Sequence, residues 1–328
     1  MCSVPSVAKQ IILCVLCALC GQKNYSLCAL CPLWLNKKAY SVAKDKDRDY
    51  NWSEEQMKDF LSINNYPAEL LKELLRMSAR LKSLCTVGGK DLCLAGKTLA
   101  MLFEKPSLRT RISFQVAMTD LGGNPIYVKP EDIGGIGKRE PVKDIARILS
   151  RYVDGIMART FEHNTVVELA QYAKVPVINA LTDWLHPCQA MADVLTIQEH
   201  CRDYEGVKIA FIGDGNNVAR SLAHACSKLH MKMVIASPAG YELDTETIEN
   251  VNQITADCVR QTNDPGAAVL DADIIYTDTW VSMGQEAEKQ KRQADFAGFQ
   301  VNAELVKSAP ANAKIMHCLP AYRGLEIT

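Results

Sequence analysis

Short apolar runs alternate with longer stretches of mixed polarity along most of this chain. The runs are bounded by glycine, proline or polar residues, which is typical of buried strands, and the stretches between them are long enough for helices. The apolar runs lie at 99–103, 124–128, 155–158, 175–180, 207–212, 232–236, 274–277 and 314–317. Strands that alternate with helices predict an α/β fold with two doubly wound domains, each with a parallel sheet flanked by helices.

The stretches between the runs carry the signals of helices. Ser107 precedes a stretch without glycine or proline that Gly122 ends, so a helix is predicted over 108–121. An earlier helix is indicated by an apolar stripe at helical spacing, formed by Leu70, Leu71, Leu74, Leu75 and Leu81. Further helices are predicted over 141–152, 163–174, 186–200, 217–230, 245–255 and 285–296.

The chain divides into an N-terminal extension and two predicted domains. Its 328 residues are enough for two domains of ordinary size, each with its own core. We predict an extension over 1–50, a first domain over 51–186 and a second domain over 187–328. No proline- or glycine-rich linker separates the two halves, and the helix that follows His186 is the predicted connection.

The extension differs in composition from the rest of the chain. Its first acidic residue is Asp45, and the segment up to Lys44 contains lysine but no arginine. An acid-poor, serine-containing N-terminus is typical of an organelle transit peptide, whereas the apolar run 11–20 is also typical of a secretory signal and is too short to span a bilayer. We predict a targeting segment for the mitochondrial matrix or another organelle, with the cytoplasm as the alternative.

Charge and cysteine content narrow the class of protein. The net charge is −1 and 48% of the residues are hydrophobic, which fits a globular protein and gives no sign of a nucleic-acid or membrane partner. The thirteen cysteines are odd in number and scattered, which indicates a reducing compartment and not a disulfide framework. Cys14, Cys17, Cys20, Cys28 and Cys31 have the spacing of a metal knuckle, but the residues between them are mostly apolar, and we predict neither metal nor cofactor.

Polar and charged residues follow several of the predicted strands. In open parallel sheets a ligand binds at the carboxyl ends of the strands. Those ends carry Ser107, Arg159, His186, the turn 213–217, Asp278 and Cys318. Their shared position predicts a single binding site at the edges of the sheets.

The clearest chemical signal is a pair of arginines at the start of a helix. Arg109 and Arg111 lie in the first turn after Ser107, where the helix dipole disfavours each cation by about 0.3–1 kcal/mol. A bound anion removes this penalty, because backbone N–H groups, hydroxyls and both guanidinium groups then converge on one phosphate-like ligand. A basic turn that faces solvent is the alternative.

Three further positions suggest chemistry but leave alternatives open. Arg159 is predicted either to help neutralise the anion or to form a surface ion pair. His186 and Gln189 share one face of a helix start and suit a polarised carbonyl, although a buried core histidine is the common alternative. Asp278 suits a substrate ammonium group by a charge-assisted hydrogen bond, or simply forms a turn.

Two other motifs invite chemical interpretations that their surroundings weaken. The Gly-x-Gly turn 213–215 resembles a nucleotide-binding loop, but Val218 replaces the third glycine and Asn217 adds an amide better suited to a zwitterion. Cys318 follows a strand and is predicted to contact substrate and not to attack it. The reason is that His317, its neighbour in a strand, is expected to point to the opposite face.

Five separated motifs, taken in order, resemble the aspartate/ornithine carbamoyltransferase family. They are Ser107-Leu108-Arg109-Thr110-Arg111, Arg159, His186-Pro187-Cys188-Gln189, Asp278-Thr279-Trp280-Val281-Ser282-Met283-Gly284 and His317-Cys318-Leu319-Pro320. The last two resemble the ornithine branch, because aspartate relatives have a proline after the histidine and lack the Ser-Met-Gly loop. The resemblance extends from Trp52 to the final residue.

The resemblance implies a reaction and a set of site residues. The reaction transfers the carbamoyl group of carbamoyl phosphate to the δ-amine of L-ornithine, giving L-citrulline and phosphate, as a step of arginine and urea-cycle metabolism. The implied contacts to carbamoyl phosphate are Ser107, Leu108, Arg109, Thr110, Arg159, His186, Gln189, Cys318 and Leu319. The implied contacts to ornithine are Asn217, Asp278, Ser282 and Met283. Arg109, Arg159, His186 and Cys318 are the implied catalytic residues of a homotrimer that needs no cofactor and no metal.

Other functions remain open beside this reaction. A transferase of the same fold that acts on another amine, such as putrescine, a non-catalytic relative and a nucleotide-binding enzyme are the alternatives. Family members continue past the position of Thr328 with a segment that supplies a further arginine to carbamoyl phosphate. The resemblance therefore implies that this chain is truncated and lacks one phosphate contact, which keeps a non-catalytic relative open.

Overall fold

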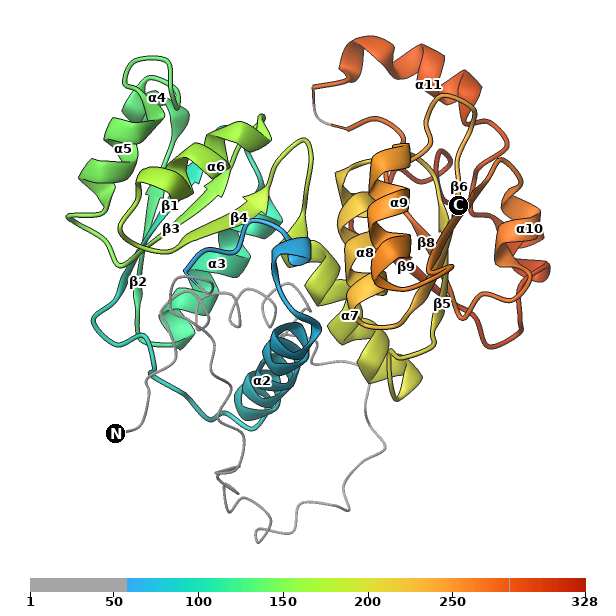
Figure 1. Cartoon of the computed structure of the whole chain (residues 1–328), viewed down its shortest axis with the longest axis horizontal. Coiled ribbons are helices and arrows are strands. Elements are labelled where there is room, and N and C mark those ends of the chain that lie inside the picture. Colours follow the sequence, from blue (N-terminus) through green and yellow to red (C-terminus); the bar gives the residue numbers. More distant parts are fainter. Residues whose placement is uncertain (1–57, 283) are drawn as a thin grey trace, which may run out of the picture.

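Two parallel β-sheets, each flanked by helices, form the two lobes of the molecule (Figure 1). This computed structural model describes residues 58–282 and 284–328. The extension 1–50 and its cysteine motif lie outside the described residues. The fold class predicted from the alternating pattern is confirmed, since each lobe has its own parallel sheet between layers of helices.

The first sheet has the strand order β2-β1-β3-β4, with every neighbouring pair parallel. Its strands are β1 (Thr98–Phe103), β2 (Asn124–Val128), β3 (Gly155–Arg159) and β4 (Val177–Leu181). The helices of this lobe are η2 (Ile63–Asn65), α2 (Ala68–Thr86), α3 (Leu108–Asp120), α4 (Pro130–Ile133), α5 (Val142–Leu149) and α6 (His163–Tyr172). Met101 packs in a core with residues of α2 and α3, and Leu102 in a core with residues of α5 and α6. Burial on both faces is why the inner strands β1 and β3 appear as continuous apolar runs.

The second sheet has the order β7-β6-β5-β8-β9 and is also parallel throughout. Its strands are β5 (Lys208–Ile212), β6 (Lys232–Ala236), β7 (Val259–Thr262), β8 (Ile274–Thr277) and β9 (Lys314–His317). The helices are α8 (Asn217–Lys228), α9 (Thr245–Ile254), α10 (Pro265–Val269), η3 (Glu286–Glu288), α11 (Lys289–Asp295) and α12 (Ala303–Lys307). Phe211 packs in a core with residues of α8 and α9, whereas Ile212 packs with Trp280 and Phe296 on the opposite face.

Several elements differ from those that the pattern predicts. The strand β7 and the short helices α4, α10 and α12 were not predicted, because they are short or lack an apolar run. The helix predicted over 285–296 is the short 3-10 helix η3 followed by α11. The other predicted helices are present, and some of them, such as α5, end a few residues before the predicted boundary.

The helix α7 (Pro187–Cys201) joins the two lobes and is buried along most of its length (Figure 1). It packs against α2 from the first lobe and α8 from the second, and Met191 lies in the same hydrophobic cluster as Leu71 and Phe211. One continuous core therefore extends across both lobes. The domain boundary between residues 186 and 187 stays a prediction. In the described part of the chain, none of the helices combines the length and apolarity needed to cross a membrane.

The wholly buried Phe60 extends the first sheet beyond β4. Its N–H donates to Val177 O at 2.8 Å, its carbonyl accepts from Asn179 N at 2.9 Å, and its ring lies 5.3 Å from the ring of Tyr66 between centroids. We expect Phe60→Ala to lower the free energy of unfolding by about 3–5 kcal/mol, because a cavity replaces the ring. Equilibrium unfolding in urea measures this loss.

The control is an aromatic side chain on the surface. Tyr152 is 76% exposed, so we expect Tyr152→Ala to change the free energy of unfolding by no more than about 0.5 kcal/mol. Equal losses for Phe60→Ala and Tyr152→Ala would contradict the placement of Phe60 in the core.

Candidate active site

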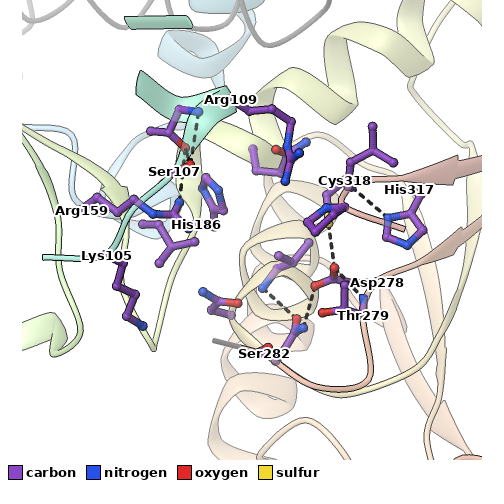
Figure 2. Close-up of a pocket in the computed structure, with 18 of the residues that line it drawn as sticks. Lys105, Ser107, Arg109, Arg159, His186, Asp278, Thr279, Ser282, His317 and Cys318 are labelled. Atoms are coloured by element: carbon purple, nitrogen blue, oxygen red, sulfur yellow. Dashed lines mark hydrogen bonds between the residues drawn. The ribbon is translucent and has the colours of Figure 1, made fainter. Parts of the chain in front are cut away.

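A cleft of about 1560 Å³ lies between the lobes, and residues that follow strands of both sheets line it (Figure 2). The predicted site residues that line it are Ser107, Leu108, Arg109, Thr110, Arg159, His186, Gln189, Asn217, Asp278, Ser282, Cys318 and Leu319. Met283, the remaining one, lies outside the described residues. The cleft thus gathers side chains of α7 and side chains at or after the ends of β1, β3, β5, β8 and β9, as expected for parallel sheets.

The first turn of α3 is joined to the end of β3 by hydroxyl groups. Ser107 is the N-cap of α3, and its Oγ accepts from Thr110 N at 3.4 Å and donates to Thr110 Oγ1 at 3.0 Å. Arg159 Nη1 donates to the same Thr110 Oγ1 at 3.3 Å. These contacts fix a guanidinium group beside the open N–H groups of a helix, which is the local arrangement of an anion site.

Arg109 and Arg159 form no ion pair with the acidic residues of the described part of the chain. Arg159 is only 5% exposed, and its Nε has no hydrogen-bond partner. Burial, and then the charge of Arg109, lower the pKa of Arg159 to about 10. The side chain stays charged at neutral pH. A bound anion would therefore offset both the cost of burying this charge and its repulsion by Arg109.

Arg111 does not join this site. Its guanidinium group lies 4.0 Å from the centre of the Tyr127 ring, and its Nε donates to Gln115 Oε1 at 3.3 Å. It does not line the cleft. The expectation that both arginines of the first turn converge on one ligand is therefore wrong for Arg111, because the helix turns its side chain toward β2.

His186 is a buried and neutral histidine at the start of α7. Its backbone N–H donates to Ser221 Oγ at 2.8 Å, and its Nδ1 has no partner among the described residues. Burial, and then the charge of Arg159, lower the pKa of His186 to about 3. Below about pH 6.5 this imidazole is protonated in the unfolded chain but not in the folded one. The free energy of unfolding therefore decreases as the pH falls. At neutral pH the imidazole offers one N–H donor without adding a further charge.

On the opposite side of the cleft, three donors hold the carboxylate of Asp278 (Figure 2). One oxygen accepts from Thr279 N at 2.7 Å and from Cys318 Sγ at 2.9 Å, and the other accepts from Asn216 Nδ2 at 2.8 Å. Burial, and then the charge of Asp278, raise the pKa of the Cys318 thiol well above its usual range. The thiol therefore stays protonated and donates to the carboxylate, and it is unsuited to nucleophilic attack.

The side chains of His317 and Cys318 lie on the same side, contrary to expectation. One ligand atom from each of them and one carboxylate oxygen of Asp278 lie within 4.8 Å of one another. The expectation of opposite faces is wrong because β9 ends at His317 and the chain turns through Leu319, whose φ is 62°. Both ring nitrogens of His317 already have hydrogen-bond partners, which disfavours metal binding by this group. Nε2 contacts Glu326 at 3.1 Å, and Nδ1 accepts from Leu319 N at 2.9 Å.

The two remaining predicted residues of the second lobe take part in its loops. Asn217 Nδ2 donates to Thr182 O at 2.5 Å and so joins the start of α8 to the loop before α7. The backbone N–H of Ser282 donates to Gln285 Oε1 at 3.1 Å, a contact within its own loop. Both residues line the cleft beside Asp278.

Several residues that line the cleft were not predicted from the sequence. Lys105 is buried directly after β1, with its Nζ 4.1 Å from the centre of the Phe161 ring. Its position after the carboxyl end of β1 is the sequence feature from which it could be predicted. Arg292 donates to Asp214 at 2.8 Å from α11, and no local pattern marks this contact because the two residues are far apart in the sequence. Asp193, on α7, is likewise buried and lines the cleft.

Comparisons with known proteins agree with one another. Residues 58–199 match the family model of the aspartate/ornithine carbamoyltransferase carbamoyl-P binding domain, and residues 205–328 match that of the Asp/Orn binding domain. The ornithine carbamoyltransferase of Anoxybacillus flavithermus is 50% identical over 83% of this chain and 87% of its own length. A solved structure of ornithine carbamoyltransferase from Pyrococcus furiosus is 48% identical, has a TM-score of 0.80, and is matched over 83% of this chain and 87% of that one.

The neutral state of His186 can be measured directly. In an NMR titration of the imidazole nitrogens from about pH 8 to about pH 5, we expect His186 to stay unprotonated, because burial opposes its charge. Arg159→Met is the control variant. It removes the second cause of the shift and should raise the pKa of His186, which nevertheless stays below about 6.5 because burial is the larger cause. Protonation of wild-type His186 with a midpoint near about pH 6.5 would contradict this assignment.

Proposed function

Because this chain belongs to the aspartate/ornithine carbamoyltransferase family, we propose that it transfers the carbamoyl group of carbamoyl phosphate to the δ-amine of L-ornithine. The products are L-citrulline and phosphate, and the reaction is a step of arginine metabolism. The observation that carries the proposal is the cleft itself. It places Arg109 and Arg159, which have no acidic partner among the described residues, opposite a carboxylate held by three donors, which suits a dianionic donor and an amino-acid acceptor.

The phosphate of carbamoyl phosphate binds at the start of α3 in this proposal. The backbone N–H groups of Leu108 and the residues just after it form the positive end of the helix dipole. Arg109 extends from the same turn and supplies a bidentate guanidinium group. The hydroxyls of Ser107 and Thr110 complete a cradle for a tetrahedral anion, which also stabilises phosphate as it leaves.

The carbamoyl carbonyl lies between Arg159, His186 and Thr110. As the amine attacks the carbonyl carbon, negative charge develops on the oxygen, and these groups are fixed donors aimed at that charge. Because His186 is neutral, its N–H stabilises the oxyanion without repelling Arg159. Gln189 binds the amino end of the carbamoyl group, and Leu319 with Cys318 closes that side of the site.

Ornithine binds on the side of the second lobe. Asp278 receives its α-ammonium group, while Asn217, Ser282 and Met283 contact the rest of the amino acid. The δ-amine must be neutral to attack, and no group in the cleft is arranged as a strong base, since the thiol of Cys318 is held protonated. Orientation of the two substrates and preorganised charge therefore account for most of the acceleration.

The assembly and location of the protein are also part of this proposal. A homotrimer is the oligomeric state that the sequence resemblance implies. The acid-poor composition of residues 1–50 supports a targeting segment for the mitochondrial matrix or another organelle. Size-exclusion chromatography with light scattering tests the trimer, and imaging of the full chain with and without residues 1–50 tests the targeting.

The first test compares two arginines of the same helical turn. We expect Arg109→Ala to lower kcat/KM for citrulline formation by at least about 30-fold, because a charge-assisted contact worth roughly 2–5 kcal/mol is lost. Arg111→Ala removes the same charge from a residue that contacts Tyr127 outside the cleft. It should leave the KM for carbamoyl phosphate within about twofold of the wild-type value. An Arg109→Ala enzyme with near-normal turnover would refute the site.

The second test separates the two halves of the site. We expect Asp278→Asn to raise the KM for ornithine by about tenfold or more, because hydrogen bonds to charged groups contribute about 1.5–3 kcal/mol. The KM for carbamoyl phosphate should change by no more than about twofold. Initial rates of citrulline formation at varied concentrations of each substrate measure both constants. Equal increases in both would show that Asp278 serves the whole cleft and not the amino acid alone.

A further inference from the structure

A buried carboxyl group lies directly behind the amide of Gln189. Asp193 follows Gln189 by one turn of α7 and is 5% exposed. Its Oδ1 accepts from Gln189 Nε2 at 3.0 Å, and its Oδ2 accepts from the hydroxyl of Tyr276 at 2.9 Å. Both oxygens of a buried acid are therefore satisfied by named donors, one from the connecting helix and one from β8.

This contact determines which end of the Gln189 amide faces the cleft. An ionised carboxylate only accepts hydrogen bonds, so the amide must direct its NH₂ group toward Asp193. The carbonyl oxygen Oε1 is then left on the other side, and no described residue donates to it. Gln189 lines the cleft. The group that it offers to a ligand is thus an acceptor, which matches a ligand that carries N–H donors.

The orientation does not depend on whether the acid is ionised. Burial raises the pKa of Asp193 to about 7, although the hydrogen bonds from Gln189 and Tyr276 oppose that shift. A proton on Oδ2 can be donated to the hydroxyl oxygen of Tyr276, which accepts as well as donates. Oδ1 then remains an acceptor for Gln189. Tyr276 is wholly buried on β8, so the second lobe holds this arrangement in place.

We propose that Asp193 is a positioning residue that fixes the Gln189 amide with its carbonyl oxygen toward the amino group of the carbamoyl donor. The site thereby selects a carbamoyl group over an acyl group of the same shape. This inference rests on the proposed function and adds the residue behind the contact. A ligand with a methyl group in place of the amino group leaves Oε1 without a donor in a desolvated site, and unmet polar groups are what reject such analogues.

The test measures discrimination and not activity alone. Acetyl phosphate carries a methyl group where carbamoyl phosphate carries an amino group, and it serves as a competitive inhibitor of citrulline formation by the full chain. The readout is the Ki for acetyl phosphate divided by the KM for carbamoyl phosphate. We expect Asp193→Leu to lower this ratio by about tenfold, because Gln189 is then free to turn its amide. Should Asp193→Leu fail to fold by circular dichroism, Asp193→Val is measured in the same way.

A double-mutant cycle tests whether Asp193 acts through Gln189. Gln189→Leu should lower the ratio as much as Asp193→Leu does. The Ki/KM ratio of the double variant should equal that of either single variant to within about twofold. Cys188→Ala is the matched control, because Cys188 is buried on the same helix with its thiol directed to Asn179 O at 3.4 Å. Its loss disturbs core packing and should leave the ratio unchanged.

The outcomes separate this inference from the proposal beneath it. Absence of citrulline from the wild-type chain would overturn the proposed function and this inference with it. With an active wild type, three results would overturn the inference alone: an unchanged ratio in Gln189→Leu, equal weakening of both ligands in the Asp193 variant, or losses that add in the double variant. The equal weakening would mark Asp193 as a purely structural residue.

Discussion

The cleft depends on positive charge that has no acidic partner in the part of the chain that the structure describes. Arg109 lies at the positive end of α3, and Arg159 is buried beside it with its Nε lacking a hydrogen-bond partner among the described residues. Burial and mutual repulsion make this arrangement of charges unfavourable by itself. The folded chain maintains it because Ser107 and Thr110 fix the helix start and the end of β3 against each other. The rest of the site is arranged around this charge, and His186 stays neutral partly because of it.

Hydrogen bonds between the lobes give the cleft a fixed floor. The N–H of His186 donates to Ser221, and Asn217 donates to the carbonyl of Thr182. Arg220, from α8, lies 3.5 Å from the centre of the Trp184 ring and donates to the carbonyl of the same residue. The helix α8 thus holds the loop before α7 from the second lobe, and Asp183 N donates to Phe161 O at 2.8 Å from the first. His186 follows that loop, so the position of the imidazole depends on contacts with both lobes.

Much of the fold could be predicted from the sequence, because buried parallel strands are apolar on both faces. The run Ile274–Thr277 and the run Lys232–Ala236 appear in the structure with their predicted bounds. The edge strand β7 could not be predicted in the same way, since Arg260 and Gln261 are exposed and give it no apolar run. Its position is set by the parallel pairing with β6 and not by its own composition.

The site was predictable to the extent that its residues follow strands or begin helices. Arg159 and His186 were found by position alone. The contact between Asp193 and Tyr276 was not, because it joins a helix to a strand far along the chain and has no local signature. The shared core around Met191 also has a consequence for how such proteins diversify. A lobe taken from a relative would have to match the other lobe along α7, so new substrate preferences arise more readily from changed loops than from exchanged halves.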